Sequence, residues 1–281
     1  MTVGKTENAI PIKASTVRSK DGTVIGYKSM GNGPGVIILP GLLSRSDDFA
    51  QFAQEMADTF TVHVIDRRGR GQSGPQGSEY SIRKECEDLT AVQEETGADY
   101  LFGHSYGGLV ALETARMNDR FTKIALYEPG VSVNHSIPIT WLPPFEAALN
   151  EEDTLKAFAI FVRATAPVKS ARYAPLWYLK FFLRMMRSHW GDKASLLREM
   201  ASEYKEIGRH DSGYANYGSI GASTLLMRGG KSKEAVATIE ALERTLPHHA
   251  TLVLPKFGHM APLNGHKPSG VVQQVKRYFL N

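Results

Sequence analysis

One serine lies in a sequence context that favours nucleophilic chemistry. Residues 103–107 read Gly-His-Ser-Tyr-Gly, after the apolar residues 100–102 and before small and apolar residues at helical spacing. This order predicts a strand, a very tight turn and a helix, with Ser105 at the apex of the turn. We expect glycine at 103 and 107 because a Cβ there would collide with the neighbouring strand or helix. The first amides of the following helix would then face an oxyanion formed beside Ser105.

Ser105 needs a neighbouring base, since a free hydroxyl is too weakly acidic to attack a carbonyl near neutral pH. His259 is the best candidate among the nine histidines. It follows an apolar, strand-like segment and a glycine late in the chain, which agrees with the order serine, acid, histidine. His266 is its nearest rival. His104 adjoins Ser105, but its side chain is expected to point away from the hydroxyl, into helix–sheet packing.

The composition is that of a globular protein with a sizeable core. The chain has 281 residues, of which 42% are hydrophobic and 22% charged, and this excludes disordered and collagen-like classes. The single cysteine, Cys86, excludes an intramolecular disulfide and a cysteine-based zinc site. Residues 1–19 lack an apolar segment of signal-peptide length, and no apolar run reaches about 18 residues. We therefore expect no membrane span and a cytoplasmic location.

Positive charge is concentrated in one part of the chain. Residues 163–209 contain ten Lys or Arg against four Asp or Glu, whereas the net charge of the whole chain is +4. Nucleic acid is not expected as a partner, because there is no basic tail, zinc finger or RNA-binding motif. Residues 176–190 would form an amphipathic helix with Lys180, Arg184 and Arg187 on its polar face. Those cations would attract an anionic substrate, contact an anionic membrane surface or simply face solvent.

Short apolar strands alternate with helices through the first 130 residues. The expected strands are 14–19, 23–29, 36–39, 61–65, 100–102 and 122–127, and the expected helices are 47–58, 81–96 and the one after Ser105. The first two strands would form a hairpin. The alternation predicts an α/β fold with a mainly parallel sheet, helices on both faces and a ligand site at the carboxyl ends of the strands. Asp66, Ser105 and Glu128 all follow such ends.

The alternation stops near residue 131. It resumes with a strand at 224–227, a helix at 235–246, a strand at 251–254 and a helix at 269–280. The segment between has no strand-like run and contains all three tryptophans. We therefore expect a core made of residues 1–130 and 219–281, and a helical cap, residues 131–218, over the strand ends.

Four motifs resemble, in the same order, those of the α/β-hydrolase fold superfamily. Residues 39–42, Leu-Pro-Gly-Leu, look like its oxyanion loop, and 66–73, Asp-Arg-Arg-Gly-Arg-Gly-Gln-Ser, resemble the turn after its fourth strand. Residues 103–107 match its nucleophile elbow, and 257–262, Phe-Gly-His-Met-Ala-Pro, look like the loop of its catalytic histidine. The resemblance covers nearly the whole chain outside the cap. It implies a sheet of the eight-stranded type with a helical cap inserted after the sixth strand.

The resemblance leaves two positions for the acid of the triad. The usual one follows the strand after the cap, but this sequence has Lys231 there, and a cation cannot stabilise an imidazolium. The other follows the strand after the elbow, where Glu128 stands. We expect Glu128 to be the acid, with Glu234 as the alternative. In the competing structural interpretation, Glu128 only forms a salt bridge with Arg67 or Arg228.

The remaining site residues follow from the same resemblance. The oxyanion would be stabilised by the backbone amides of Leu42 and Tyr106. Asp66 and Arg67 are expected to brace the loops around the site. The cap is expected to select the substrate, with Trp141, Trp177 and Phe181 as candidate substrate-binding residues.

Together these features imply a serine hydrolase that needs no cofactor or metal. Its substrate would be a small carboxylic ester, lactone or thioester with an apolar group, and the acyl-enzyme would form on Ser105. A serine in place of the Asp nucleophile disfavours epoxide hydrolases and haloalkane dehalogenases. Two alternatives stay open: a ligand-binding or signalling protein that does not hydrolyse its ligand, and triad chemistry on carbon–carbon bonds by a hydrolase or lyase.

Overall fold

Eight strands form a single, mainly parallel sheet in the computed structural model, which describes residues 10–166 and 169–281. The strands are β1 (Lys13–Arg18), β2 (Val24–Met30), β3 (Gly35–Leu39), β4 (Thr61–Ile65), β5 (Tyr100–His104), β6 (Lys123–Tyr127), β7 (Ser223–Gly229) and β8 (His249–Leu254). They follow the order β1-β2-β4-β3-β5-β6-β7-β8. The pairs β1–β2 and β2–β4 are antiparallel, and all others are parallel. The predicted fold class and the hairpin are confirmed.

The central strands are apolar throughout because both faces of the sheet are covered. Successive side chains of a strand point to opposite faces, and in β3 Val36 and Ile38 belong to one core whereas Ile37 and Leu39 belong to the other. All four are buried. A continuous apolar run therefore indicates a strand between two layers of helices.

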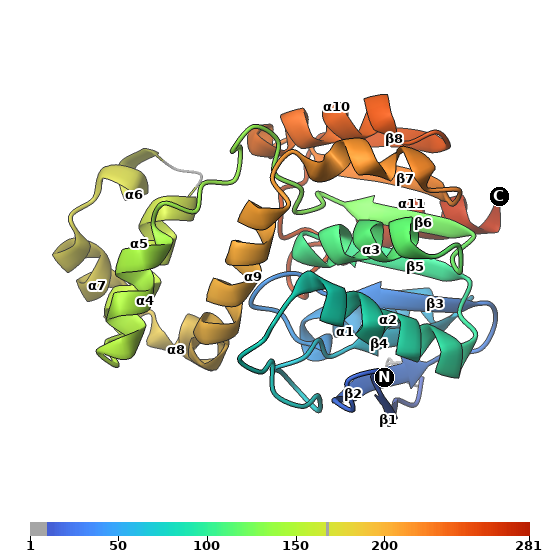
Figure 1. Ribbon diagram of the computed structural model, residues 1–281, viewed down its shortest axis with the longest axis horizontal. Coiled ribbons are helices and arrows are strands. Elements are labelled where there is room, and N and C mark those ends of the chain that lie inside the picture. Colours follow the sequence, from blue (N-terminus) through green and yellow to red (C-terminus); the bar gives the residue numbers. More distant parts are fainter. Residues whose placement is uncertain (1–9, 167–168) are drawn as a thin grey trace, which may run out of the picture.

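Five helices form these two layers (Figure 1). On one face lie α2 (Ile82–Thr96), α3 (Tyr106–Met117) and α10 (Val236–Thr245). On the other face lie α1 (Ala50–Met56), which follows the short 3-10 helix η1 (Ser46–Phe49), and α11 (Pro268–Leu280). Since β3 to β8 run parallel, their carboxyl ends meet at one edge of the sheet, and the loops leaving that edge carry the candidate site.

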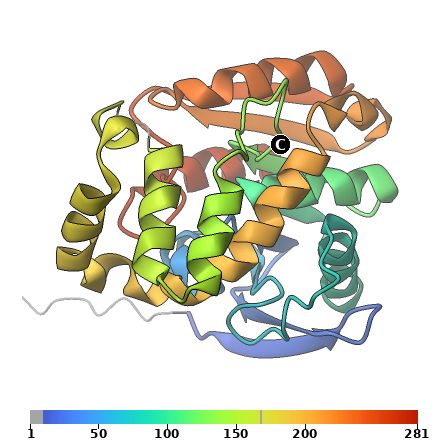
Figure 2. The ribbon, with the colours of Figure 1, turned by 60° about the vertical axis from the view of Figure 1, so that its left-hand side comes forward.

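The segment between β6 and β7 is helical in its described residues. It contains α4 (Leu142–Asn150), α5 (Thr154–Thr165), α6 (Lys169–Tyr173), α7 (Leu176–Met185), α8 (Arg187–Trp190), η2 (Gly191–Leu196), α9 (Leu197–Arg209) and η3 (Gly213–Ser219). Helix α9 lies next to the sheet core, whereas α6 and α7 lie at the far end of the segment (Figures 1 and 2). Within the described residues, no helix is both long and apolar enough to cross a membrane. We propose that residues 131–218 form a cap, and we call them the cap segment.

Candidate active site

Ser105 occupies a strained turn between β5 and α3. Its backbone has φ +53° and ψ −123°, a combination that costs a non-glycine residue energy and persists only where the surroundings enforce it. Three hydrogen bonds do so: the Ser105 amide donates to the carbonyl of Tyr127 (3.1 Å), and its carbonyl accepts from the amides of Gly108 (2.8 Å) and Gly130 (2.7 Å). The turn therefore holds the serine between the end of the strand and the start of the helix.

The two glycines of the elbow are required by close backbone packing. A Cβ on Gly103 would lie 2.8 Å from the Cα of Gly108, and one on Gly107 would overlap the carbonyl oxygen of Leu39. Gly41 passes directly over the serine, because a Cβ there would lie 3.0 Å from the Cβ of Ser105. The steric prediction for residues 103 and 107 is confirmed, and the early loop is in place beside the elbow.

The loops after β6 and β8 bring Glu128 and His259 together. Nδ1 of His259 lies 2.7 Å from Oε2 of Glu128. The other carboxylate oxygen accepts a hydrogen bond from the amide of Gly229 at 2.8 Å, and the Glu128 side chain is only 2% exposed. An ionised carboxylate accepts only, so the Nδ1 proton lies toward Glu128 and leaves Nε2 as the basic nitrogen. A buried acceptor of this kind fixes the tautomer and the ring orientation.

The rival carboxylate and the rival histidine lie elsewhere. Glu234 is exposed in the 3-10 helix η4 (Lys233–Ala235), and His266 is exposed just before α11. Glu128 also does not pair with the arginines of the competing interpretation. Arg67 pairs with Glu85, and Arg228 donates to the carbonyl of Gly229.

The amides expected to stabilise an oxyanion are unoccupied by protein acceptors. Among the described residues, neither the amide of Leu42 nor that of Tyr106 has a hydrogen-bond partner. Gly130 leaves space beside the second amide, since a Cβ there would lie 3.1 Å from the Tyr106 nitrogen. Both amides are thus available to a negatively charged oxygen near Ser105.

A family model described as the alpha/beta hydrolase fold matches residues 34–265. The chain belongs to this family. A crystal structure of an α/β hydrolase from Sphaerobacter thermophilus is similar to it, with a TM-score of 0.79, 28% sequence identity and coverage of 94% of this chain and 100% of that one. The resemblance identified from the four motifs is confirmed.

Curated relatives match over shorter stretches. An N-formylmaleamate deformylase of Pseudomonas putida is 31% identical over 107 residues, which are 36% of this chain and 40% of that protein. The acetyltransferase component (dihydrolipoyllysine-residue) of an acetoin cleaving system from Cupriavidus necator is 30% identical over 113 residues, 39% of this chain and 30% of that protein. The chain therefore matches less than half the length of each.

Two further residues of this α/β hydrolase hold the loop that carries His259. Nε2 of His104 lies 2.9 Å from the carbonyl oxygen of His259, and the Tyr127 hydroxyl donates to the carbonyl of Gly258 at 2.9 Å. Burial, together with a smaller contribution from the neighbouring His259, lowers the pKa of His104 to about 3, so its ring is neutral and donates through Nε2. Sequence reasoning placed His104 only in helix–sheet packing. Its position one residue before Ser105 was the available signal.

A buried ionic cluster joins the hydrolase core to the cap segment. Arg67 and Arg70, from the turn after β4, both pair with Glu203 of α9, and the Arg67–Glu203 distance is 2.8 Å. Arg67 also pairs with Glu85 at 2.8 Å, and all four side chains are buried. Removal of one partner from such a cluster leaves an uncompensated buried charge. The cluster therefore ties α9 to the turn after β4.

The same cluster contacts the Gly41 carbonyl and the Tyr106 side chain, next to the two amides expected to stabilise an oxyanion. Arg67 Nη2 donates to the carbonyl of Gly41 at 3.0 Å, which is the carbonyl of the peptide that bears the Leu42 amide. The Arg67 guanidinium lies 4.8 Å from the centre of the Tyr106 ring, and the Tyr106 hydroxyl is 2.8 Å from that of Tyr80. The prediction that Arg67 braces the loops is confirmed. Glu203 was not predicted, although a glutamate between Met200, Tyr204 and Ile207 on a helix face is a signal for a buried ion pair.

Asp66 braces the neighbouring loops, as predicted. Its Oδ1 accepts from the amide of Ser46 at 2.8 Å, and its Oδ2 accepts from the amide of Gln72 at 3.1 Å. The side chain is buried. One carboxylate thus links the loop after β3 to the turn after β4.

The three aromatic residues proposed to bind substrate occupy different environments. Trp141 is buried within the cap segment, where its ring packs edge-on against Phe145 and Tyr204. Trp177 and Phe181 lie on α7 with most of their surface exposed. Their role in substrate binding stays a prediction.

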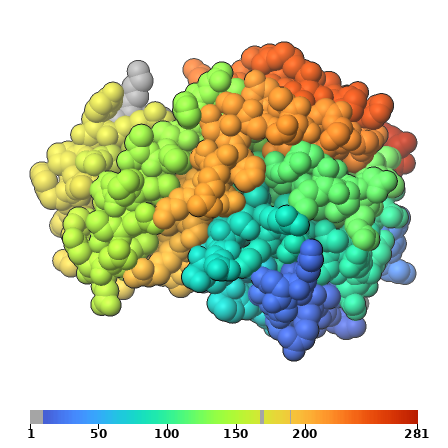
Figure 3. Space-filling model, in the orientation of Figure 1, coloured from blue at the N-terminus to red at the C-terminus, as the bar shows by residue number. Residues whose placement is uncertain are grey.

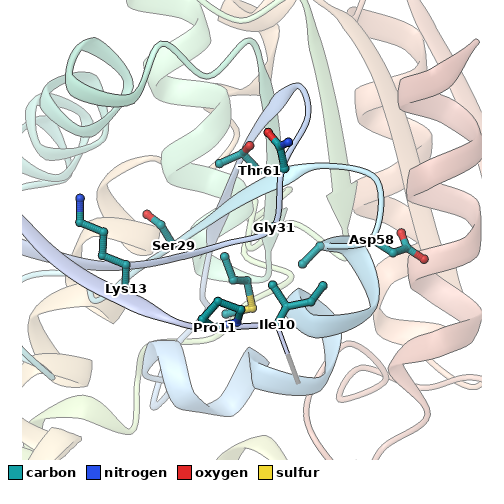
Figure 4. Close-up of a pocket in the computed structure, with 10 residues that line it drawn as sticks. Ile10, Pro11, Lys13, Ser29, Gly31, Asp58 and Thr61 are labelled. Carbon is teal, nitrogen blue, oxygen red and sulfur yellow. The ribbon is translucent and has the colours of Figure 1, made fainter. Parts of the chain in front are cut away.

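A hollow of ≈ 570 Å³ lies away from these residues, at the amino end of β4 (Figure 4). Ile10, Lys13, Ser29 and Thr61 are among the residues that line it. Parallel strands have their amino ends at the edge opposite to the carboxyl ends, so this hollow is not part of the candidate active site. Within the described residues, no group of three or more His, Cys, Asp or Glu side chains could hold a metal ion.

Proposed function

We propose that this protein is a serine hydrolase that cleaves a carboxylic ester, lactone or thioester through an acyl-enzyme on Ser105. The observation that carries the proposal is the 2.7 Å pairing of the His259 ring with the buried carboxylate of Glu128, on loops adjoining a strained serine. That pairing leaves Nε2 as a base, which a serine nucleophile requires. The proposed hydrolase is cytoplasmic, independent of a cofactor and specific for a small molecule.

In the first half of the proposed reaction, the Ser105 oxygen attacks the carbonyl carbon while Nε2 of His259 takes the serine proton. The carbonyl electrons move to the oxygen, which the amides of Leu42 and Tyr106 stabilise. Glu128 stabilises the imidazolium that forms. Collapse of the tetrahedral intermediate breaks the bond to the leaving alcohol or thiol, and His259 protonates that group.

In the second half, His259 removes a proton from water as the water oxygen attacks the acyl carbon. The same amides stabilise the second oxyanion, and collapse returns the proton to Ser105 and releases the acid. The cap segment would cover the acyl group, with Trp141, Trp177 and Phe181 as candidate contacts. Its positive charge favours an anionic substrate.

The direct test combines covalent labelling with turnover. Wild-type protein should react with a fluorophosphonate and hydrolyse a short-chain aryl ester, whereas Ser105→Ala should do neither and retain its circular dichroism spectrum. Ser15→Ala, on the edge strand β1, is a control outside the site and should be labelled normally. Undiminished hydrolysis by Ser105→Ala would refute the serine mechanism. A wild-type protein that resists the label would favour a non-hydrolytic ligand-binding role.

The deformylase relative favours a second candidate function, hydrolysis of an N-formyl amide. That protein is 31% identical over 107 residues, and the same triad chemistry applies, with the amide nitrogen protonated by His259 as the carboxamide leaves and the formyl group held on Ser105. Formate release from N-formyl amides, measured beside ester hydrolysis, separates the two. Carbon–carbon bond cleavage would instead be recognised by product analysis.

A further inference from the structure

The outer helix of the cap segment exposes an unusual amount of apolar surface. The exposed large apolar side chains on α7 are Trp177 (72%), Tyr178 (51%), Phe181 (62%), Phe182 (50%) and Met185 (72%). Residues three or four apart share a helix face, so these five form one broad stripe, which we call the α7 stripe. An exposed apolar patch of this kind marks a surface that contacts something else.

The opposite face of α7 is already used in folding. Leu179 and Leu183 are buried, and they pack in a small core with Ala159 and Trp190. The indole of Trp190 donates to the carbonyl of Leu183 at 2.8 Å. Helix α7 is therefore anchored through Leu179 and Leu183, and the packing of the cap segment does not require the α7 stripe.

The surroundings of the α7 stripe are positively charged. Residues 154–191 contain seven Lys or Arg and no Asp or Glu. Arg172, Arg184 and Arg187 are exposed, and among the described residues none of them forms an ion pair with a carboxylate. Lys180 differs, since it pairs with Asp153 at 2.8 Å. The surface that complements this stripe must therefore be both apolar and anionic.

We propose that the α7 stripe docks this protein onto the surface of an anionic lipid bilayer. Trp and Tyr rings favour the boundary between headgroups and acyl chains, and Arg184 and Arg187 would bind lipid phosphates beside them. A short helix with a large aromatic face and flanking cations lies in the plane of that boundary. Figures 1 and 3 place α7 at the end of the molecule farthest from the sheet core, so a flat surface can reach it.

A second copy of the chain fits the stripe less well. In a symmetric pair the same patch occurs on both sides, so Arg184 and Arg187 of one copy would meet the same cations of the other. No carboxylate in residues 154–191 would neutralise them. The charge pattern thus favours phosphate over self-association.

The chain contains its own reporter of docking. Trp177 is exposed, whereas Trp141 and Trp190 are buried, so lipid insertion should change the emission of Trp177 alone. Vesicles of phosphatidylcholine with phosphatidylglycerol should shift the tryptophan emission to shorter wavelength and co-sediment with the full chain. Phosphatidylcholine alone should bind far less, and high salt should weaken binding. Trp177→Phe should remove the spectral shift.

Two variants separate the apolar and the charged parts of the stripe. Phe182→Ser with Met185→Ser should weaken partitioning to anionic vesicles at least about tenfold, while the thermal midpoint and hydrolysis of a soluble ester stay unchanged. Leu280→Ser is the matched control, because Leu280 is as exposed as Phe181, at 62%, but lies at the end of α11. Arg184→Glu with Arg187→Glu should remove the preference for anionic vesicles.

Three outcomes would overturn the proposal. The first is that the protein does not bind anionic vesicles, and the second is that it binds neutral vesicles equally well. The third is that Leu280→Ser weakens vesicle binding as much as Phe182→Ser with Met185→Ser does. Sedimentation velocity provides a further check: a dimer that the Phe182→Ser, Met185→Ser variant abolishes would assign the stripe to a second copy of the chain.

Discussion

The guanidinium of Arg67 donates a hydrogen bond to the carbonyl oxygen of Gly41, and the nitrogen–oxygen distance is 3.0 Å. A trans peptide is planar, with its C=O and N–H pointing in opposite directions. Holding the Gly41 carbonyl therefore orients the amide of Leu42, one of the two proposed oxyanion donors. Arg70 reaches the same carbonyl at 3.4 Å. Glu203, which pairs with both arginines, lies in the cap segment.

Arg67→Lys tests this positioning role. Lysine keeps the charge beside Glu85 and Glu203 but cannot hold the carboxylates and the Gly41 carbonyl at once. We expect kcat for an ester substrate to fall about 10- to 100-fold, with little change in KM, because the lost interaction acts on the transition state.

Arg68→Lys is the matched control for Arg67→Lys. Arg68 is equally buried in the same turn, but it pairs with Asp88 and Asp21 and does not contact the Gly41 loop. Both variants should lose some thermal stability, and only Arg67→Lys should lose turnover. Equal losses of kcat in the two would assign Arg67 a purely structural role.

Replacement of the proposed acid should reduce turnover without removing the fold. Glu128→Gln keeps an oxygen for the amide of Gly229 but loses the charge that stabilises the imidazolium. We expect kcat to fall by about 10²- to 10⁴-fold, while fluorophosphonate labelling slows to a similar extent. Glu234→Gln, in the exposed η4 turn, should behave like wild type, and the reverse pattern would make Glu234 the acid.

The buried histidines should make stability depend on pH. Burial lowers the pKa of His104 from 6.5 to about 3 and that of His63 to about 4. Below about pH 6.5 the unfolded chain binds protons at both positions and the folded protein does not, so stability is lost as the pH falls toward these values. Between about pH 7.5 and 5.5, each histidine should lower the free energy of unfolding by about 1.4 kcal/mol.

Urea unfolding of His104→Gln at both pH values checks this assignment. The variant should lose less stability on acidification than wild type, because it lacks one of the two histidines whose pKa is lowered by burial. His266→Gln, at an exposed position, should retain the wild-type pH dependence. An unchanged pH dependence in His104→Gln would show that His104 is protonated in the folded state.

Tyr127→Phe tests the support of the histidine loop. The hydroxyl donates to the carbonyl of Gly258 at 2.9 Å, so its removal should cost about 1 kcal/mol of stability. Without this hydrogen bond the His259 ring should be less precisely positioned, which should also lower kcat several-fold. Tyr278→Phe, near the end of α11 and beside the amino end of β6, should leave kcat unchanged. A normal kcat in Tyr127→Phe would mean that His104 alone is sufficient to hold the loop.

The elbow and the sheet were predictable because their signals are local. Residues 103–107 combine small residues with a serine at a strand-to-helix junction, and backbone sterics leave few other conformations for them. The apolar runs of β3 to β6 could be placed for a similar reason, since a strand covered on both faces has no polar position. His259 could be selected from its place after the last strand-like segment.

Which carboxylate lies beside His259 was decided only by the tertiary structure. Glu128 and Glu234 both follow strands, but the parallel pairing of β6 with β7 brings Glu128 beside Gly229, whose amide holds the carboxylate toward the histidine loop. The burial of the cap tryptophans was likewise decided only by the tertiary structure. Trp141 and Trp177 both lie in sequence that predicts helices, yet Trp141 is buried and Trp177 is exposed.

By itself, the sequence determined the fold class and the positions that we propose for the nucleophile and the catalytic histidine, because the motifs that mark them are patterns of neighbouring residues. The tertiary structure decided the partner of His259, the hydrogen bond from Arg67 to the Gly41 carbonyl, and the pairing of Arg67 with Glu203 of the cap segment. Those contacts join residues far apart in the chain, and their energies depend on burial and distance, which no local pattern of residue types contains.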